Sequence, residues 1–191
     1  MTPGRLRLIS MGAIAAEAAL VSLAWSQTWF ELTVSNAPLT VPGAVAGGAL
    51  LPLALASLAV VAALALAGPF FRVVLGVLDA LLGVCVLAVA VWSVSDPVRA
   101  SLQLLAETTG ISGEQTLRDM VTASSATTWP FVALALGVIT VLTGLAVTVT
   151  SRAWPTSGAK YSRTRAETPE GDPIHDWDAL TEGDDPTETP R

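Results

Sequence analysis

Two acidic side chains, Glu17 and Asp79, lie inside long apolar segments, and their position suggests chemistry. Glu17 is in the stretch AIAAEAALVSLAW (13–25), and Asp79 is in ALALAGPFFRVVLGVLDALLG (63–83). An acidic residue near the centre of a membrane-spanning helix raises the free energy of insertion by about 3 kcal/mol. Such a residue either forms hydrogen bonds that fix the register of packed helices or belongs to a proton or cation pathway. The sequence is consistent with both roles.

Polar residues in the other apolar segments can reach the same depth. Glu17 and Asp79 each lie about nine residues, or roughly 13 Å, from the expected cytoplasmic end of their helix. Asp79 and Thr140 each have glycines three residues before and four residues after them, which lets neighbouring helices approach closely. We therefore predict an intramembrane polar layer in the bundle interior, made of Glu17, Ser57, Asp79, Thr140 and Thr143.

The elements that must position this layer are four hydrophobic helices. The chain has 191 residues, of which 52% are hydrophobic and only 14% are charged, whereas about a quarter of a soluble domain is charged. About 20 apolar residues span a hydrocarbon core about 30 Å thick. We expect an all-α protein, a four-transmembrane-helix bundle with short extracytoplasmic helices, whose spans cover about 8–25, 44–67, 70–93 and 130–150.

The distribution of basic residues predicts the orientation of these spans. Arginine and lysine gather beside three of the span ends and in the tail, whereas only Arg99 and Arg118 lie on the other side. By the positive-inside rule, both termini of this multi-pass cell-membrane protein are expected to be cytoplasmic. The first span is longer than the apolar region of a cleaved signal peptide, so we expect it to be retained.

Tryptophan residues lie near the expected ends of the spans. Indole rings favour the headgroup region because the ring is apolar while its N–H stays hydrated. The alternative is an aromatic cage around a ligand. We predict an interfacial belt of Trp25, Trp29, Trp92, Trp129 and Trp154.

The two outer segments have their own local signals. Segment 26–43 alternates apolar and polar residues around Asn36-Ala37-Pro38, which suits a short hairpin. In segment 94–129 we expect two short helices, the first capped by Asp96 with Pro97 at its first position. Ser112 and Gln115 have capping-box spacing for the second helix, which would bury Leu117, Met120 and Val121.

The chain divides at about residue 150 into a membrane domain, 1–150, and an acidic tail, 151–191. The tail is rich in proline and charge, so it is predicted to be disordered and cytoplasmic. Its island HDWDALTEGDDPT (175–187) could bind a cytosolic protein through Trp177, Asp178 and Leu180, or could simply be solvated.

Several classes of function lack their sequence signals. We find no phosphate-binding loop, no metal-ligand spacing and no nucleophile motif, and we expect no cofactor, no metal and no enzyme activity. The single cysteine, Cys85, and single histidine, His175, cannot build a thiol cluster or a catalytic triad. Nothing is basic enough to indicate nucleic-acid binding. The expected partners are the lipid bilayer, a cytosolic protein at the tail, and further copies of the chain.

Two short motifs carry a resemblance to a known family. They are R-x-x-L-G, from Arg72 to Gly76, and WDAL-x-x-G-x-DPT, from Trp177 to Thr187. With four spans and an acidic first span, the chain resembles the tryptophan biosynthesis-associated membrane proteins of actinobacteria. That family is named from the position of its genes, and the resemblance implies no catalytic residues.

These observations leave two functions from different classes. The first is a non-enzymatic accessory or scaffold protein of the cytoplasmic membrane associated with tryptophan biosynthesis. The alternative is a small oligomeric transporter that exports tryptophan or a related compound through Glu17 and Asp79. A third, less developed hypothesis is that segment 94–128 binds a partner in the cell envelope.

Overall fold

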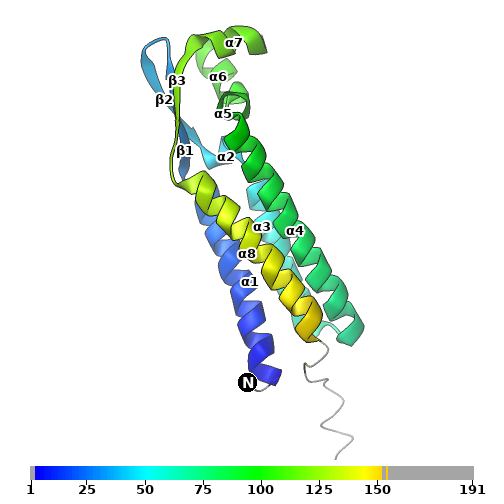
Figure 1. The fold of residues 1–191 in the computed structure, drawn as a ribbon. Helices are drawn as coiled ribbons and strands as arrows, with labels where there is room; N and C mark the ends of the chain where they lie inside the picture. Colours follow the sequence, from blue (N-terminus) through cyan, green and yellow to red (C-terminus); the bar gives the residue numbers. More distant parts are fainter. Residues whose placement is uncertain (1–2, 152–153, 155–191) are drawn as a thin grey trace, which may run out of the picture. The chain divides into compact units, whose positions relative to one another are not determined.

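Four long helices run side by side as a bundle, and a small sheet with three short helices lies at one end of it (Figure 1). The computed structural model describes residues 3–151 and Trp154, which belong to one compact unit, Met1–Trp154. The predicted tail, with His175, Trp177, Asp178 and Leu180, lies outside the described residues.

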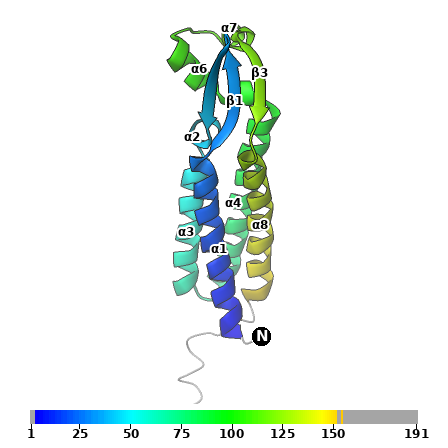
Figure 2. The same ribbon diagram turned by 90° about the vertical axis from the view of Figure 1, so that its left-hand side faces the viewer.

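The bundle consists of α1 (Pro3–Ser26), α3 (Leu50–Leu66), α4 (Pro69–Ser95) and α8 (Trp129–Thr150). Helix α4 packs most extensively on α8, while α1 contacts both α3 and α8, and α3 contacts α4. Figure 2 shows the four helices in this arrangement, with α1 between α3 and α8 and with α4 behind them. Each helix therefore presents one side to the bundle interior.

Glycine allows the close approach of α4 and α8. A Cβ atom added at Gly83 would lie 2.6 Å from the backbone nitrogen of Val141. A Cβ atom added at Gly144 would collide with the backbone nitrogen of Ala80. Because neither glycine carries a side chain, the two backbones touch directly, as is common between helices in membranes.

Three of the described helices are long and apolar enough to cross a membrane, covering Gly4–Ser26, Pro69–Ser95 and Trp129–Thr150. The second predicted span, 44–67, is not one continuous helix. It is divided into a short helix, α2 (Gly43–Ala46), a turn, and α3, whose 17 residues are fewer than in the other three. Gly47 stands at this turn against the ring of Trp29, where an added Cβ would lie 3.1 Å from the ring.

The outer surface of the bundle is apolar over most of its length. Large aliphatic side chains of all four long helices point outward and are about half exposed or more, including Leu20, Leu55, Leu81, Val84 and Leu142. Polar side chains such as Asp79 and Thr140 are buried instead. This distribution suits a surface that faces acyl chains rather than water.

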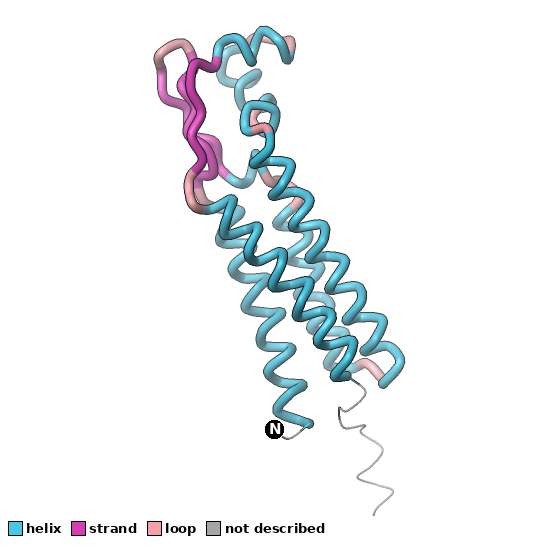
Figure 3. Tube along the Cα trace, in the orientation of Figure 1, coloured by secondary structure: helices cyan, strands magenta, loops and turns pink. Residues whose placement is uncertain are grey.

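A three-stranded antiparallel sheet corrects the all-α prediction. Its strands, magenta in Figure 3, are β1 (Thr28–Val34), β2 (Ala37–Pro42) and β3 (Val121–Ala126). They are hydrogen-bonded in the order β2-β1-β3. The predicted hairpin at 26–43 forms, but its turn residues are Ser35 and Asn36, both with positive φ, rather than Asn36 to Pro38. Two consecutive positive φ values are typical of a type I′ hairpin turn. The protein is mostly helical, with this small sheet.

Three short helices follow α4, namely α5 (Pro97–Ala100), α6 (Leu102–Thr109) and α7 (Glu114–Met120). Asp96 caps α5 as predicted, because its side chain accepts a hydrogen bond from the backbone nitrogen of Arg99 at 3.0 Å. The capping box of Ser112 and Gln115 does not form, since α7 begins after Gly113 with no side-chain cap. Leu117 is buried, but Val121 belongs to β3 and not to a helix.

Candidate functional site

The buried apolar side chains form two clusters, and polar residues lie between them along the helices. The larger cluster extends from beneath the sheet into the bundle, where it includes Ala18 and Leu136. The smaller cluster, with Ile14, Val60 and Val147, lies toward the end at which the chain starts. Glu17 on α1, Ser57 on α3 and Thr140 on α8 are buried polar residues that lie between the two clusters along their helices. Asp79 on α4 is also buried, and it lies between Leu75 and Leu82, which pack against the smaller cluster.

Glu17 is held by the last helix of the bundle. The hydroxyl of Thr143 on α8 donates a 2.7 Å hydrogen bond to Oε1 of Glu17. Glu17 is only 6% exposed, and its second oxygen, Oε2, has no hydrogen-bond partner among the described residues. Thr140 also lies near Glu17, although its hydroxyl donates to the carbonyl oxygen of Leu136 one turn earlier in the same helix.

Asp79 is the most deeply buried charged residue of the described chain, with 0% of its surface exposed. Neither of its carboxyl oxygens has a hydrogen-bond partner among the described residues. Ser57 on α3 and Glu17 on α1 lie close enough to interact with Asp79, but without hydrogen-bond geometry. A buried carboxyl group without a partner carries a large desolvation cost, so its position requires a structural or functional reason.

The structure thus brings all five residues of the predicted polar layer into the bundle, four of them buried and Thr143 half-buried. This arrangement can do one of two things chemically. It can hold the helices in register through hydrogen bonds, or it can pass a proton or bind a cation between the carboxyl groups of Glu17 and Asp79. Across residues 3–151 and Trp154, no group of three histidine, cysteine or acidic side chains is placed to hold a metal ion.

Sequence reasoning missed a contact at the other end of α4. Arg72 is buried, and its Nε atom donates a 3.0 Å hydrogen bond to the carbonyl oxygen of Ala67. Its guanidinium carbon lies 5.7 Å from the ring centroid of Trp154, within the range of a cation–π interaction. Arg72 therefore does not project from the turn between helices, and Trp154 covers it.

The five tryptophans of the predicted belt do not share one environment. Trp92 is 83% exposed, and Trp25 and Trp129 are half-buried near the same end of the bundle. Trp29 is fully buried under the sheet, where its indole nitrogen donates a 2.8 Å hydrogen bond to the carbonyl oxygen of Ala24. The indole rings of Trp29 and Trp154 are therefore core groups in this chain, and the interfacial belt stays a prediction.

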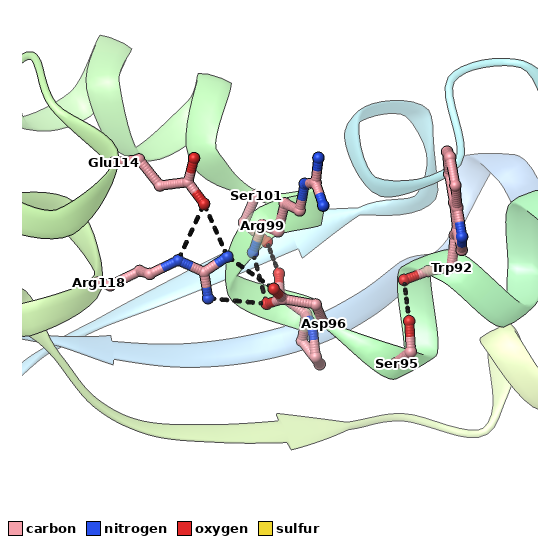
Figure 4. A network of polar contacts seen from close by, with 8 residues as sticks. Trp92, Ser95, Asp96, Arg99, Ser101, Glu114 and Arg118 are labelled. Carbon is pink, nitrogen blue, oxygen red and sulfur yellow. Dashed lines mark hydrogen bonds and ion pairs between the residues drawn. The ribbon is translucent and has the colours of Figure 1, made fainter.

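A cleft of about 290 Å³ opens where α4 ends, and sequence reasoning did not find it. Its lining includes Trp92, Ser93 and Ser95 from α4, together with Asp96 and Arg99. Beside it, Arg118 of α7 donates to both carboxyl oxygens of Asp96, at 3.2 and 2.6 Å, and to Glu114 at 2.9 Å (Figure 4). Hydrogen bonds from Arg118 and from the backbone of Arg99 hold the pKa of Asp96 below its usual range. The signal that could have revealed this site is the cluster of Asp96, Arg99 and Arg118 in an otherwise weakly charged chain.

Comparison with known protein families gives a match over most of the chain. A family model described as tryptophan-associated transmembrane protein aligns with residues 11–187. No curated protein and no solved structure is significantly similar to the chain. The matched segment includes α1 from residue 11 onward, the other three long helices, the sheet and the cleft.

Proposed function

The chain belongs to the family of tryptophan-associated transmembrane proteins, and from this premise we propose that it is a non-enzymatic accessory protein of the cytoplasmic membrane. The observation that supports the proposal is the division of the described chain into an apolar bundle and a folded cap, here defined as β1–β3 with α5–α7. In this proposal the bundle serves as an anchor, and the cap and the tail bind other proteins.

The accessory function requires a defined orientation. We infer that α3 spans the membrane together with the three longer helices, because its 17 residues cover about 25 Å and it packs against α1 and α4. The arginines near the start of α1 and α4 favour cytoplasmic termini. The cap would then lie on the outer side and the tail on the inner side.

Cysteine labelling in intact cells tests this orientation. The single native cysteine, Cys85, is first replaced by alanine, and a new cysteine is introduced either at Ser124 in β3 or at Gly68 between α3 and α4. A maleimide that does not cross membranes should label the Ser124→Cys protein in intact cells and the Gly68→Cys protein only after lysis. The reverse pattern would contradict the proposed orientation.

A transporter is the second candidate, and a specific observation favours it. Asp79 is fully buried with no hydrogen-bond partner among the described residues, and Glu17 lies close enough to interact with it. Such a pair suits proton-coupled export of tryptophan or a related compound. Because transporters of known architecture place their sites between repeated helical units, four helices would need to assemble as an oligomer.

One complementation experiment separates the two candidates. Cells that lack the gene are compared with cells that carry the wild type, the Glu17→Gln/Asp79→Asn double variant, or the Trp177→Ala variant, and internal and external tryptophan are measured. The accessory function predicts that the double variant restores the wild-type tryptophan levels and that Trp177→Ala does not. The opposite result, with normal amounts of both proteins in the membrane, would support the transporter.

A further inference from the structure

The cleft at the end of α4 lies at the boundary between the bundle and the cap. Trp25 near the end of α1 and Trp129 at the start of α8 lie at this end of the bundle, as does Trp92 on α4. Tryptophan favours the headgroup region of a bilayer. The cleft therefore opens at the depth at which phospholipid headgroups begin.

Of the two arginines near the cleft, Arg118 is paired with acidic side chains, whereas the side chain of Arg99 can bind a ligand. Both carboxyl oxygens of Asp96 accept hydrogen bonds from Arg118, and Oδ1 also accepts one from the backbone nitrogen of Arg99. The side chain of Arg99 is exposed and forms no hydrogen bond and no ion pair with a described residue. In Figure 4 its terminal nitrogens point away from Asp96, with no contact drawn to them. A guanidinium group in this position can form two parallel hydrogen bonds to a phosphate.

The other wall of the cleft is apolar and continues along the bundle. Trp92 and Val89 line the cleft, and Cys85 and Leu81 follow on the same face of α4, at a spacing of three to four residues. Leu81 and Cys85 are exposed, as is Trp92. A ligand with its phosphate on Arg99 would thus have a continuous apolar surface beside it for an acyl chain.

We propose that this cleft binds a phospholipid, with the phosphate of the headgroup on the guanidinium group of Arg99 and the adjoining acyl chain along Trp92 and the outer face of α4. A free phosphate ion shares the same hydrogen-bond chemistry but does not use the apolar wall. The bound phospholipid would fix the depth at which the cap meets the membrane.

Native mass spectrometry of the full-length protein in detergent tests the proposal, with phosphatidylglycerol as the probe. The wild type should retain one lipid in a saturable way, and Arg99→Gln should weaken its binding about tenfold, because a charge-assisted hydrogen bond is lost. Trp92→Ala should weaken binding as well. Arg5→Gln is the matched control, since Arg5 is an exposed arginine at the opposite end of the bundle, and it should leave binding unchanged.

Two further measurements keep the result unambiguous. The melting temperature of Arg99→Gln should stay close to that of the wild type, because the exposed Arg99 side chain forms no hydrogen bond and no ion pair with a described residue and acts on Asp96 only through its charge. Weaker binding then cannot be ascribed to unfolding. Inorganic phosphate and the headgroup without acyl chains should displace the lipid only at far higher concentrations. Equal retention by wild type and Arg99→Gln, lipid uptake without saturation, or equal displacement by inorganic phosphate would each overturn the proposal.

Discussion

The hydroxyl of Thr143 on α8 donates a 2.7 Å hydrogen bond to the carboxyl group of Glu17 on α1. This bond joins the first and last long helices of the chain, which contact each other far less than α4 and α8 do. A single polar interaction therefore matters more between α1 and α8 than it would between α4 and α8. In the interior of a membrane protein such a bond stabilises helix association by about 1 kcal/mol.

Replacing Thr143 by valine should lower the free energy of unfolding by about 1 kcal/mol, because the side chain keeps its shape but no longer donates to Glu17. The measurement is thermal or denaturant unfolding of the purified protein in detergent. Thr150→Val is the control, since its hydroxyl bonds only to Ala146 within the same helix, and it should change stability less. Equal losses in the two variants would show that the contact between α1 and α8 does not depend on this bond.

Gly144→Ala should destabilise the bundle by about 1–3 kcal/mol, because a Cβ atom at this position collides with the backbone of α4 at Ala80. Gly12→Ala provides the matched control on α1, where nothing lies within 4 Å of the added atom. That variant should be neutral or more stable by up to about 1 kcal/mol, because alanine favours the helix. Unfolding curves of both variants check this, and a neutral Gly144→Ala would mean that α4 and α8 can separate at little cost.

Trp29→Ala should lower the free energy of unfolding by about 3–5 kcal/mol, because it leaves a large cavity in the core beneath the sheet. Trp29→Phe keeps an aromatic ring but loses the hydrogen bond to the carbonyl oxygen of Ala24, so it should lower the free energy of unfolding less than Trp29→Ala does. The lost hydrogen bond accounts for about 1 kcal/mol, in addition to the effect of the smaller ring. Limited proteolysis distinguishes the cap from the bundle. In the alanine variant we expect cleavage near β1 and β2 while the long helices stay protected, and simultaneous cleavage throughout would show instead that the cap and bundle unfold together.

The ion pair of Asp96 and Arg118 should stabilise the cap at neutral pH, and this stabilisation should be lost in acid. Because the folded protein holds the pKa of Asp96 below its usual value, the stabilisation is complete above the unfolded pKa of about 3.9. It is lost as the pH falls through the lower pKa of the folded state.

Melting temperatures of wild type and Asp96→Asn between pH 7 and pH 2 test this sign. The wild type should melt at a higher temperature than the variant at pH 7, and the difference should shrink only below about pH 4. Glu107→Gln, an acid outside this ion-pair network, serves as the control. A difference that stays constant down to pH 2 would contradict the assignment.

Helix α4 could be predicted from the sequence because characteristic residues mark both of its ends. Gly68-Pro69 and Asp96-Pro97 delimit α4, which runs from Pro69 to Ser95 against a prediction of 70–93. The third strand could not be predicted in this way. Its residues, VTASSA, are mostly exposed and carry no alternating pattern, and they pair with β1 nearly a hundred residues earlier, where Phe30 faces Ala126.

In the candidate site, too, features set by one helix could be predicted from the sequence, and contacts between distant segments could not. Counting residues from the helix ends placed Glu17 and Asp79 at one depth, and in the structure they lie close enough to interact. The contact of Arg72 with Trp154 depends on how α4 meets the chain after α8, which no local pattern encodes. The cleft likewise forms only when the end of α4 meets α2 and α5, so its lining residues are distributed over three helices.

The pairing of β1 with β3 sets an order of events during biosynthesis. Strand β1 follows the first helix and β3 directly precedes the last, so the ribosome must complete both middle helices before β3 exists. Until then β1 and β2 form only a two-stranded ribbon, which is marginally stable alone. When β3 pairs with β1, the sheet connects the end of α1 to the start of α8 outside the bundle. The sheet is therefore completed late in the maturation of the protein.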